Sequence, residues 1–206
     1  MVILGTQVFA QQKPDALVSY RSGRDMEGRG RNDEAAVLYN EAARICMEEI
    51  NNKEATMDTY AVFTWTLQRQ KKYNEVVVRG NEALRSGVDY RIIETMGEAY
   101  FYLGNFTASL NSMQRYTNQL PNGDRASVAY FFIGEIYRYQ KKFHYADIAY
   151  TTAVRLTPDV ALWWFRLGTV RESAGEKQYA IEAYERALKI DANYNQAKEA
   201  LTRART

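Results

Sequence analysis

Two stretches of this 206-residue chain, 127–160 and 161–194, overlay at a spacing of 34 residues. The matched positions are Tyr130 with Trp164, Ile133 with Leu167, Gly134 with Gly168, Ala146 with Ala180, Tyr150 with Tyr184, and Ala153 with Ala187. A fixed period of this length is typical of one helix pair repeated along the chain, with each pair stacked on the next. The period therefore predicts an all-α fold and favours a binding scaffold over a catalyst.

Small residues recur where the two helices of a pair must cross. Two helices approach to about 8 Å only where the facing side chains are small. Gly134 with Ala146, and Gly168 with Ala180, place a small residue on each helix of a pair. The bulky rings at the other matched positions then fill the space beside the crossing, so we expect them to be structural.

These residues are those of the tetratricopeptide repeat, and the chain resembles that family from about Ala16 to its end. The resemblance implies a right-handed α-solenoid of stacked antiparallel helix pairs. Five repeats are expected within a single domain over 16–206, and the first two match the family pattern least well. The repeats span 16–49, 57–89, 90–123, 127–160 and 161–194, with three extra residues, 124–126, after the third. Residues 195–206 are predicted to form a capping helix with a polar outer face.

Composition argues against several function classes. The chain is 46% hydrophobic and 25% charged, with a net charge of +2 and acids interspersed with bases. The sequence has no cluster of basic residues of the kind that binds nucleic acid, so no nucleic-acid partner is predicted. It also has no apolar segment close to the about 18 residues needed to cross a bilayer. Cys46, the only cysteine, falls on an apolar helical stripe and is expected to be a small buried hydrophobe.

Catalytic and metal-binding groups are sparse. His144 is the only histidine and is expected at a helix turn, so neither a nucleophile–histidine pair nor a histidine-rich metal site is predicted. Glu94 and Glu98 lie four residues apart on one helical face and could share a proton. The favoured interpretation of this pair is two solvated groove acids. We therefore predict no enzymatic activity, no cofactor and no metal.

The first residues look like the tail of an export signal. The stretch 1–9 is mostly apolar, and Val8, Phe9 and Ala10 precede Gln11 in the pattern of a signal-cleavage site. On this interpretation residues 1–10 are a signal-peptide remnant, 11–15 form a lead-in, and the mature protein is exported, with the periplasm as its expected location. The alternative is the frayed N-terminus of a cytoplasmic protein.

The family resemblance implies a concave groove lined by the first helix of each repeat. In this chain the groove positions are rich in aromatic residues and arginine, which are enriched at binding hot spots. The predicted partner-binding residues are Tyr20, Arg24, Trp65, Arg69, Arg91, Glu94, Glu98, Phe101, Tyr102, Phe131, Glu135, Arg138, Tyr139, Phe165 and Glu172. For Phe131 and Phe165 the competing interpretation is packing against the neighbouring repeat. Arg69, Arg91 and Arg138 are the expected charged handles for a partner.

Three functions stay open on this sequence. The first is a non-enzymatic adaptor that binds a peptide or protein segment in the groove and helps to assemble an envelope or secretion complex. The second is a structural subunit that self-associates into a homo-oligomer through Tyr-rich convex or terminal surfaces. The third is recognition of a small ligand or a glycan by the aromatic groove.

Overall fold

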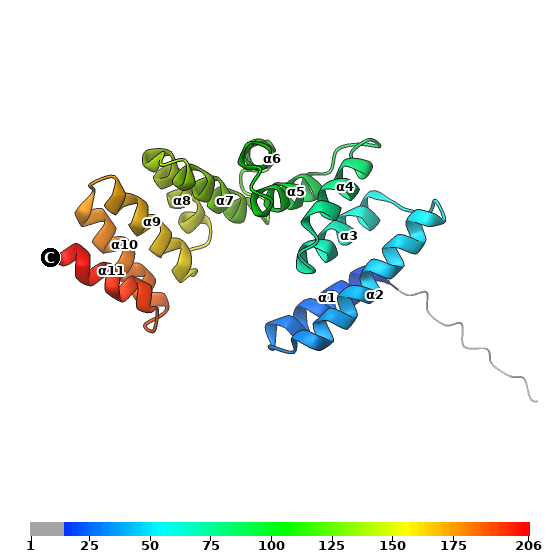
Figure 1. The fold of residues 1–206 in the computed structure, drawn as a ribbon, viewed down its shortest axis with the longest axis horizontal. Coiled ribbons are helices and arrows are strands. Elements are labelled where there is room, and N and C mark those ends of the chain that lie inside the picture. Colours follow the sequence, from blue (N-terminus) through cyan, green and yellow to red (C-terminus); the bar gives the residue numbers. More distant parts are fainter. Residues whose placement is uncertain (1–14) are drawn as a thin grey trace, which may run out of the picture. The chain divides into compact units, whose positions relative to one another are not determined.

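The computed structural model describes residues 15–206. The predicted signal-peptide remnant, 1–10, and residues 11–14 of the predicted lead-in lie outside the described residues. From residue 15 onward the chain is all-helical and has no strand, as predicted (Figure 1). The helices are α1 (Ala16–Gly28), α2 (Asn32–Asn51), α3 (Met57–Arg69), α4 (Tyr73–Ala83), α5 (Tyr90–Tyr102), α6 (Phe106–Gln119), α7 (Ala126–Tyr139), α8 (Phe143–Leu156), α9 (Ala161–Ser173), α10 (Lys177–Ile190) and α11 (Asn195–Arg205).

Each expected repeat holds one pair of helices, whose first member we call the A helix and whose second we call the B helix. The turn inside every pair has a residue in the left-handed region of backbone space, and the next residue donates its N–H to the carbonyl five positions back. That bond ends the A helix. The left-handed residues are Gly30, Lys71, Gly104, Lys141 and Gly175.

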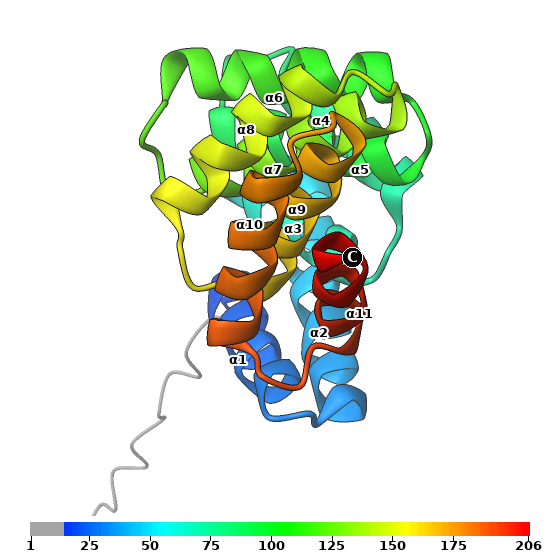
Figure 2. The same ribbon diagram turned by 90° about the vertical axis from the view of Figure 1, so that its left-hand side faces the viewer.

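Contacts between helices divide the chain into two compact units, residues 1–72 and 73–206. In unit 1, α1 packs on α2, α2 packs on α3, and α1 also contacts α3. In unit 2, each helix from α4 to α11 packs on the next one, and the A helices also meet, α5 with α7 and α9 with α11. Helices α9, α10 and α11 lie side by side at the C-terminal end (Figure 2). The single domain over 16–206 stays a prediction.

A glycine on the A helix makes room for a ring on the B helix. A Cβ atom added to Gly134 would lie 2.6 Å from the Tyr150 ring, and one added to Gly168 would lie 2.4 Å from the Tyr184 ring. Both rings are fully buried. The expected crossing of glycine with alanine is therefore filled by the tyrosine ring itself, since the ring lies directly against the glycine backbone.

One smaller expectation is also met. Cys46 is completely buried, and this burial raises the pKa of its thiol to about 12, so it is a packing residue in α2. Among residues 15–206, none of the helices is both long enough and apolar enough to cross a membrane.

We predict that Gly168→Ala lowers the free energy of unfolding by about 1–3 kcal/mol, because the new methyl group overlaps the Tyr184 ring in a filled core. Urea unfolding followed by circular dichroism measures the loss. Gly28→Ala is the matched control, because a Cβ atom at the end of α1 would meet nothing within 4 Å. A Gly168→Ala protein as stable as the Gly28→Ala protein would contradict the prediction.

Candidate functional site

The predicted groove residues lie on the A helices of both units. Unit 1 carries Tyr20 and Arg24 on α1, and Trp65 and Arg69 on α3. The remaining predicted residues lie on α5, α7 and α9, and we call them the A-helix face of unit 2. This face consists of Arg91, Glu94, Glu98, Phe101, Tyr102, Phe131, Glu135, Arg138, Tyr139, Phe165 and Glu172.

In unit 1, Tyr20 is a core residue, and the prediction that it is open to a partner is wrong. Its ring is buried among its neighbours, 5.7 Å from the ring of Trp65 and 6.0 Å from that of Tyr39. The Tyr39 hydroxyl donates to Glu27 at 2.8 Å. Burial and this hydrogen bond raise the pKa of Tyr39. Tyr20 thus joins α1 to both α2 and α3.

Glu135 on α7 accepts hydrogen bonds from two side chains and forms an ion pair with a third, so that three helices meet at this carboxylate. It is only 6% exposed. The Tyr150 hydroxyl of α8 donates to it, the Arg138 guanidinium donates to both of its oxygens, and Nε of Arg166 on α9 lies 3.1 Å from Oε1. Burial and the adjacent carboxylate raise the pKa of Tyr150. The prediction that Glu135 is an open groove acid is wrong, because its charge is used to join α7, α8 and α9.

Glu172 on α9 repeats this arrangement at the next junction. The Tyr184 hydroxyl of α10 donates to Oε2 at 2.7 Å, and the Arg203 guanidinium of α11 donates to both oxygens at 2.8 and 2.9 Å. The hydrogen bonds from Arg203 lower the pKa of Glu172. Because Arg203 is mostly exposed, this pair adds less stability than the buried bonds of Glu135.

Glu94 and Glu98 on α5 form a carboxyl pair under one arginine. Glu94 is only 2% exposed, so the interpretation of two solvated acids is wrong. Arg125, the residue that precedes α7, pairs with both carboxylates and lies 3.2 Å from Glu94. Burial and the neighbouring charge of Glu98 raise the pKa of Glu94, against the opposing effect of Arg125. A proton shared by the pair fits this geometry.

The three expected charged handles are all paired inside the chain. Arg69 lies 3.5 Å from Glu27, Arg91 lies 2.6 Å from Asp89, and Arg138 is bound to Glu135. Asp89 also caps α5 by accepting the backbone N–H of Arg91. A partner must therefore compete with these carboxylates for the arginines, or accept hydrogen bonds from guanidinium N–H groups that the ion pairs do not use.

Two tyrosines are the aromatic side chains of the A-helix face of unit 2 that are exposed. Tyr102 is 53% exposed and Tyr139 is 55% exposed. The Tyr102 ring stacks on Tyr73 of α4 with centres 4.8 Å apart, and the Tyr139 ring stacks on Phe106 of α6 at 5.3 Å. Phe101 lies between them, 5.7 Å from Tyr102 and 6.0 Å from Tyr139. The exposed rings therefore rest on packed rings.

The competing interpretation holds for the other two phenylalanines. Phe131 of α7 stacks on Trp163 of α9 with ring centres 5.3 Å apart. Phe165 is buried, with its ring 5.2 Å from that of Tyr194 and 5.9 Å from that of Tyr184. Phe165 is thus a core residue. Phe131 packs against the neighbouring repeat through its contact with Trp163.

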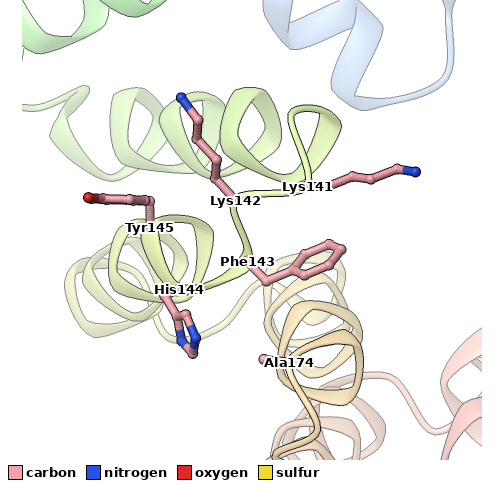
Figure 3. A pocket seen from close by; sticks show the side chains of 6 residues that line it. All are labelled: Lys141, Lys142, Phe143, His144, Tyr145 and Ala174. Carbon is pink, nitrogen blue, oxygen red and sulfur yellow. The ribbon is translucent and has the colours of Figure 1, made fainter.

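An open pocket of about 200 Å³ lies at the turn between α7 and α8. Figure 3 shows that its polar groups diverge: the ammonium groups of Lys141 and Lys142 point apart, and His144 projects to the opposite side from Lys142. No group of three metal-binding side chains lies together in the part of the chain that the structure describes. This pocket brings no reactive groups to one point.

A family model described as "Tetratricopeptide repeat" matches residues 133–197. The match covers α8, α9 and α10, together with the end of α7 and the start of α11. Residues 133–197 therefore match the tetratricopeptide-repeat family. Protein O-mannosyl-transferase TMTC1 of Homo sapiens is 27% identical over 175 residues, which are 84% of this chain. The chain spans only 19% of the length of that relative.

Solved structures of tetratricopeptide-repeat proteins share the fold of this chain. YrrB, a TPR protein with an unusual peptide-binding site, has a TM-score of 0.62 and 16% identity, over 91% of this chain and 92% of its own. A MamA RS-1 double mutant has a TM-score of 0.67 and 15% identity, over 86% and 94%. The first TPR of Spaghetti (RPAP3), bound to an HSP90 peptide, has a TM-score of 0.52 and 22% identity, over 56% and 90%.

The sequence analysis did not predict three arginines of this site. Arg125 lies in the three-residue extension after the third repeat, and the signal for it was the extension itself. Arg166 and Arg203 follow the glutamates Glu135 and Glu172 by 31 residues each, close to one repeat length. A glutamate followed by an arginine after about one repeat length is the pattern that would have predicted these pairs. This spacing places Glu135 on α7 and Arg166 on α9, and Glu172 on α9 and Arg203 on α11.

We predict that the stability gained by Glu94→Gln increases as the pH rises. The raised pKa means that the native state favours the protonated carboxyl. The contribution of Glu94 is therefore complete below its ordinary pKa of 4.5 and is lost as the pH rises through its value in the folded protein. Glutamine stays neutral, so the variant avoids this loss. Urea unfolding at about pH 5 and about pH 8 measures the difference.

The control for this pH experiment is Glu199→Gln, which removes one negative charge from an exposed position of α11. If Glu94→Gln and wild type differ in unfolding free energy by the same amount at both pH values, Glu94 is charged throughout and the carboxyl pair does not share a proton.

Proposed function

We propose that this protein is a non-enzymatic scaffold that binds a peptide or protein segment on the A-helix face of unit 2. The observation that carries the proposal is the pair of exposed rings, Tyr102 and Tyr139, which rest on the packed rings of Phe101 and Phe106. Tyrosine is enriched at binding hot spots, where it contributes a large apolar area and a polar hydroxyl. Rings already held by their neighbours lose little further freedom on binding, which favours affinity.

The pairing of charges on this face supports a partner held largely by apolar contacts. Glu94, Glu98, Glu135 and Glu172 are all bound to arginines of this chain. A partner that broke these pairs would leave a buried carboxylate without its counter-charge, which is costly. Docking of apolar side chains on the tyrosines avoids that cost.

The comparisons support the same class of function. The TPR of RPAP3 was solved with an HSP90 peptide, and YrrB is described by its peptide-binding site. Repeat folds of this kind typically serve as non-catalytic scaffolds. The chain spans 19% of TMTC1, so the transferase activity of that whole protein is not part of this proposal.

We further propose that the protein works outside the cytoplasm, in the assembly of an envelope or secretion complex. The supporting observation is the cleavage pattern of Val8, Phe9 and Ala10 before Gln11. We predict that protein isolated from its native cells begins at Gln11. Mass spectrometry of the N-terminal peptide checks this, and a mature chain that retains residues 1–10 would place it in the cytoplasm instead.

We predict that the double substitution Tyr102→Ala with Tyr139→Ala abolishes capture of a partner segment. Loss of two hot-spot rings weakens binding by about 2–4 kcal/mol, which is about thirtyfold or more. Both rings are exposed, so the helical content should be retained. The measurement is affinity capture from an envelope extract by wild type and variant, read by mass spectrometry.

The matched control is Tyr145→Ala with Tyr179→Ala, which removes two tyrosines of similar exposure, 60% and 58%, from the B helices α8 and α10. The same partner should be captured by this control. If the partner is lost from the control and kept by the Tyr102/Tyr139 variant, the B-helix side is the binding surface. If the protein captures only itself, the self-associating subunit is the better explanation, and sedimentation of the control variant tests it.

A further inference from the structure

The turn between α7 and α8 has a lysine in a backbone conformation that favours glycine. Lys141 has a φ of 58°, in the left-handed region. The corresponding residues of the first, third and fifth repeats are Gly30, Gly104 and Gly175. A side chain in this region is crowded by the following carbonyl oxygen, so lysine costs free energy that glycine avoids. Stability of the turn therefore favours glycine, and the lysine side chain points to a role outside the fold.

A second lysine follows at each turn inside a repeat where lysine replaces glycine. The pattern Gln-Lys-Lys and then an aromatic residue occurs at 70–73 and again at 140–143. Lys71, the left-handed residue of the second repeat, has the same φ of 58°. Two turns thus share both the lysine pair and the unfavourable backbone, and positive charge is the feature that they have in common.

The positive charge of the fourth-repeat turn is not balanced by the chain itself. Residues 136–146 include no acidic residue. The acids on either side of this stretch, Glu135 and Asp147, are both paired with arginines. Lys141 and Lys142 are exposed, and neither forms an ion pair within the described part of the chain. Two ammonium groups are therefore available to an anionic partner.

Aromatic and apolar side chains lie beside these lysines. Tyr145 is 60% exposed, and Ile148, one turn later on α8, is 64% exposed. The Tyr145 ring lies 5.3 Å from the Tyr137 ring, and the Lys142 ammonium lies 6.0 Å from the centre of the Tyr137 ring. Tyrosine is enriched where a bilayer meets water, because its ring favours the apolar side and its hydroxyl the wet side. The turn thus combines the two kinds of side chain that hold a protein at an anionic bilayer surface.

The cations of this turn spread out instead of converging. In Figure 3 the ammonium groups of Lys141 and Lys142 point apart, and His144 projects to the opposite side from Lys142. One small anion is held by donors that meet at a point. Lysines that spread apart match a surface with many separate negative charges, such as the anionic leaflet of a membrane.

We propose that the turn between α7 and α8 docks on an anionic lipid membrane. Lys141 and Lys142 lie at the lipid phosphates, and Tyr145 and Ile148 lie at the boundary between headgroups and acyl chains. Each lysine near such a surface strengthens binding about fivefold, so the docking is reversible. This membrane contact goes beyond the proposed binding of a peptide or protein segment and does not depend on it.

Co-sedimentation of the full-length protein with lipid vesicles tests the proposal. One set of vesicles is phosphatidylcholine alone, and the other contains an equal amount of phosphatidylglycerol, which is anionic. We expect the protein to sediment with the anionic vesicles, and to do so less as the salt concentration rises. The double substitution Lys141→Gly with Lys142→Gln should weaken this binding about twenty-five-fold, since two lysines are lost. Glycine suits the left-handed backbone, so this variant should resist urea at least as well as wild type, and lost binding cannot then come from lost folding.

The matched control is Lys189→Gln with Lys198→Gln, which removes two exposed lysines from α10 and α11. This control has the same net charge as the first variant and should bind the anionic vesicles like wild type. Tyr145→Ser tests the aromatic contribution. It should also weaken binding, and this loss should persist in high salt, which screens the lysines alone.

Equal sedimentation with both kinds of vesicle, or an equal loss of binding in the two double variants, would overturn the proposal, because the lysine turn would then have no special part in binding. Absence of sedimentation with either kind of vesicle would overturn it too, and an acidic protein surface would then be the better counterpart of the two lysines. Capture of a partner through Tyr102 and Tyr139 does not depend on either result, so the proposed function is tested separately.

Discussion

The fit of one ring against one glycine is the interaction on which the rest of this structure depends. In the fourth and fifth repeats, the Tyr150 and Tyr184 rings of the B helix lie against Gly134 and Gly168 of the A helix. This fit brings each tyrosine hydroxyl to a glutamate on the same A helix, Glu135 or Glu172. The glutamate then pairs with an arginine of the next A helix. Packing inside a repeat is thereby linked to pairing between repeats, because one side chain takes part in both.

The third repeat shows what happens when the ring is absent. Met113 occupies the place of the tyrosine against Gly97, and methionine has no hydroxyl to donate. Two acids of α5, Glu94 and Glu98, lie near this position, and Arg125 from the three-residue extension pairs with both. The extension thus supplies the counter-charge that this junction needs. Burial and the charge of Glu98 raise the pKa of Glu94 here, since one arginine faces two carboxyl groups.

The same pairing decides what remains available to a partner. The acids of the A-helix face form ion pairs with arginines of this chain, and Phe165 is buried in the core. Tyr102 and Tyr139 stay exposed because each lies at the C-terminal end of its A helix, with packed rings beneath it. The surface that results is aromatic.

The sequence by itself determined the helix pairs, their period, their turns and the identity of the family, because these depend on residue size at fixed spacing. The glycines Gly134 and Gly168, 34 residues apart, each with a ring on the following helix, imply close packing without any knowledge of charge. Only the tertiary structure decided which groove residues are open. Position in the repeat identifies the face on which Tyr20, Glu94 or Phe165 lies, but its burial depends on side chains from other helices. The ion-pair partners of long side chains such as Arg125 and Arg166 depend on which carboxylates lie near them in space. Those distances are determined only by the packing of neighbouring repeats.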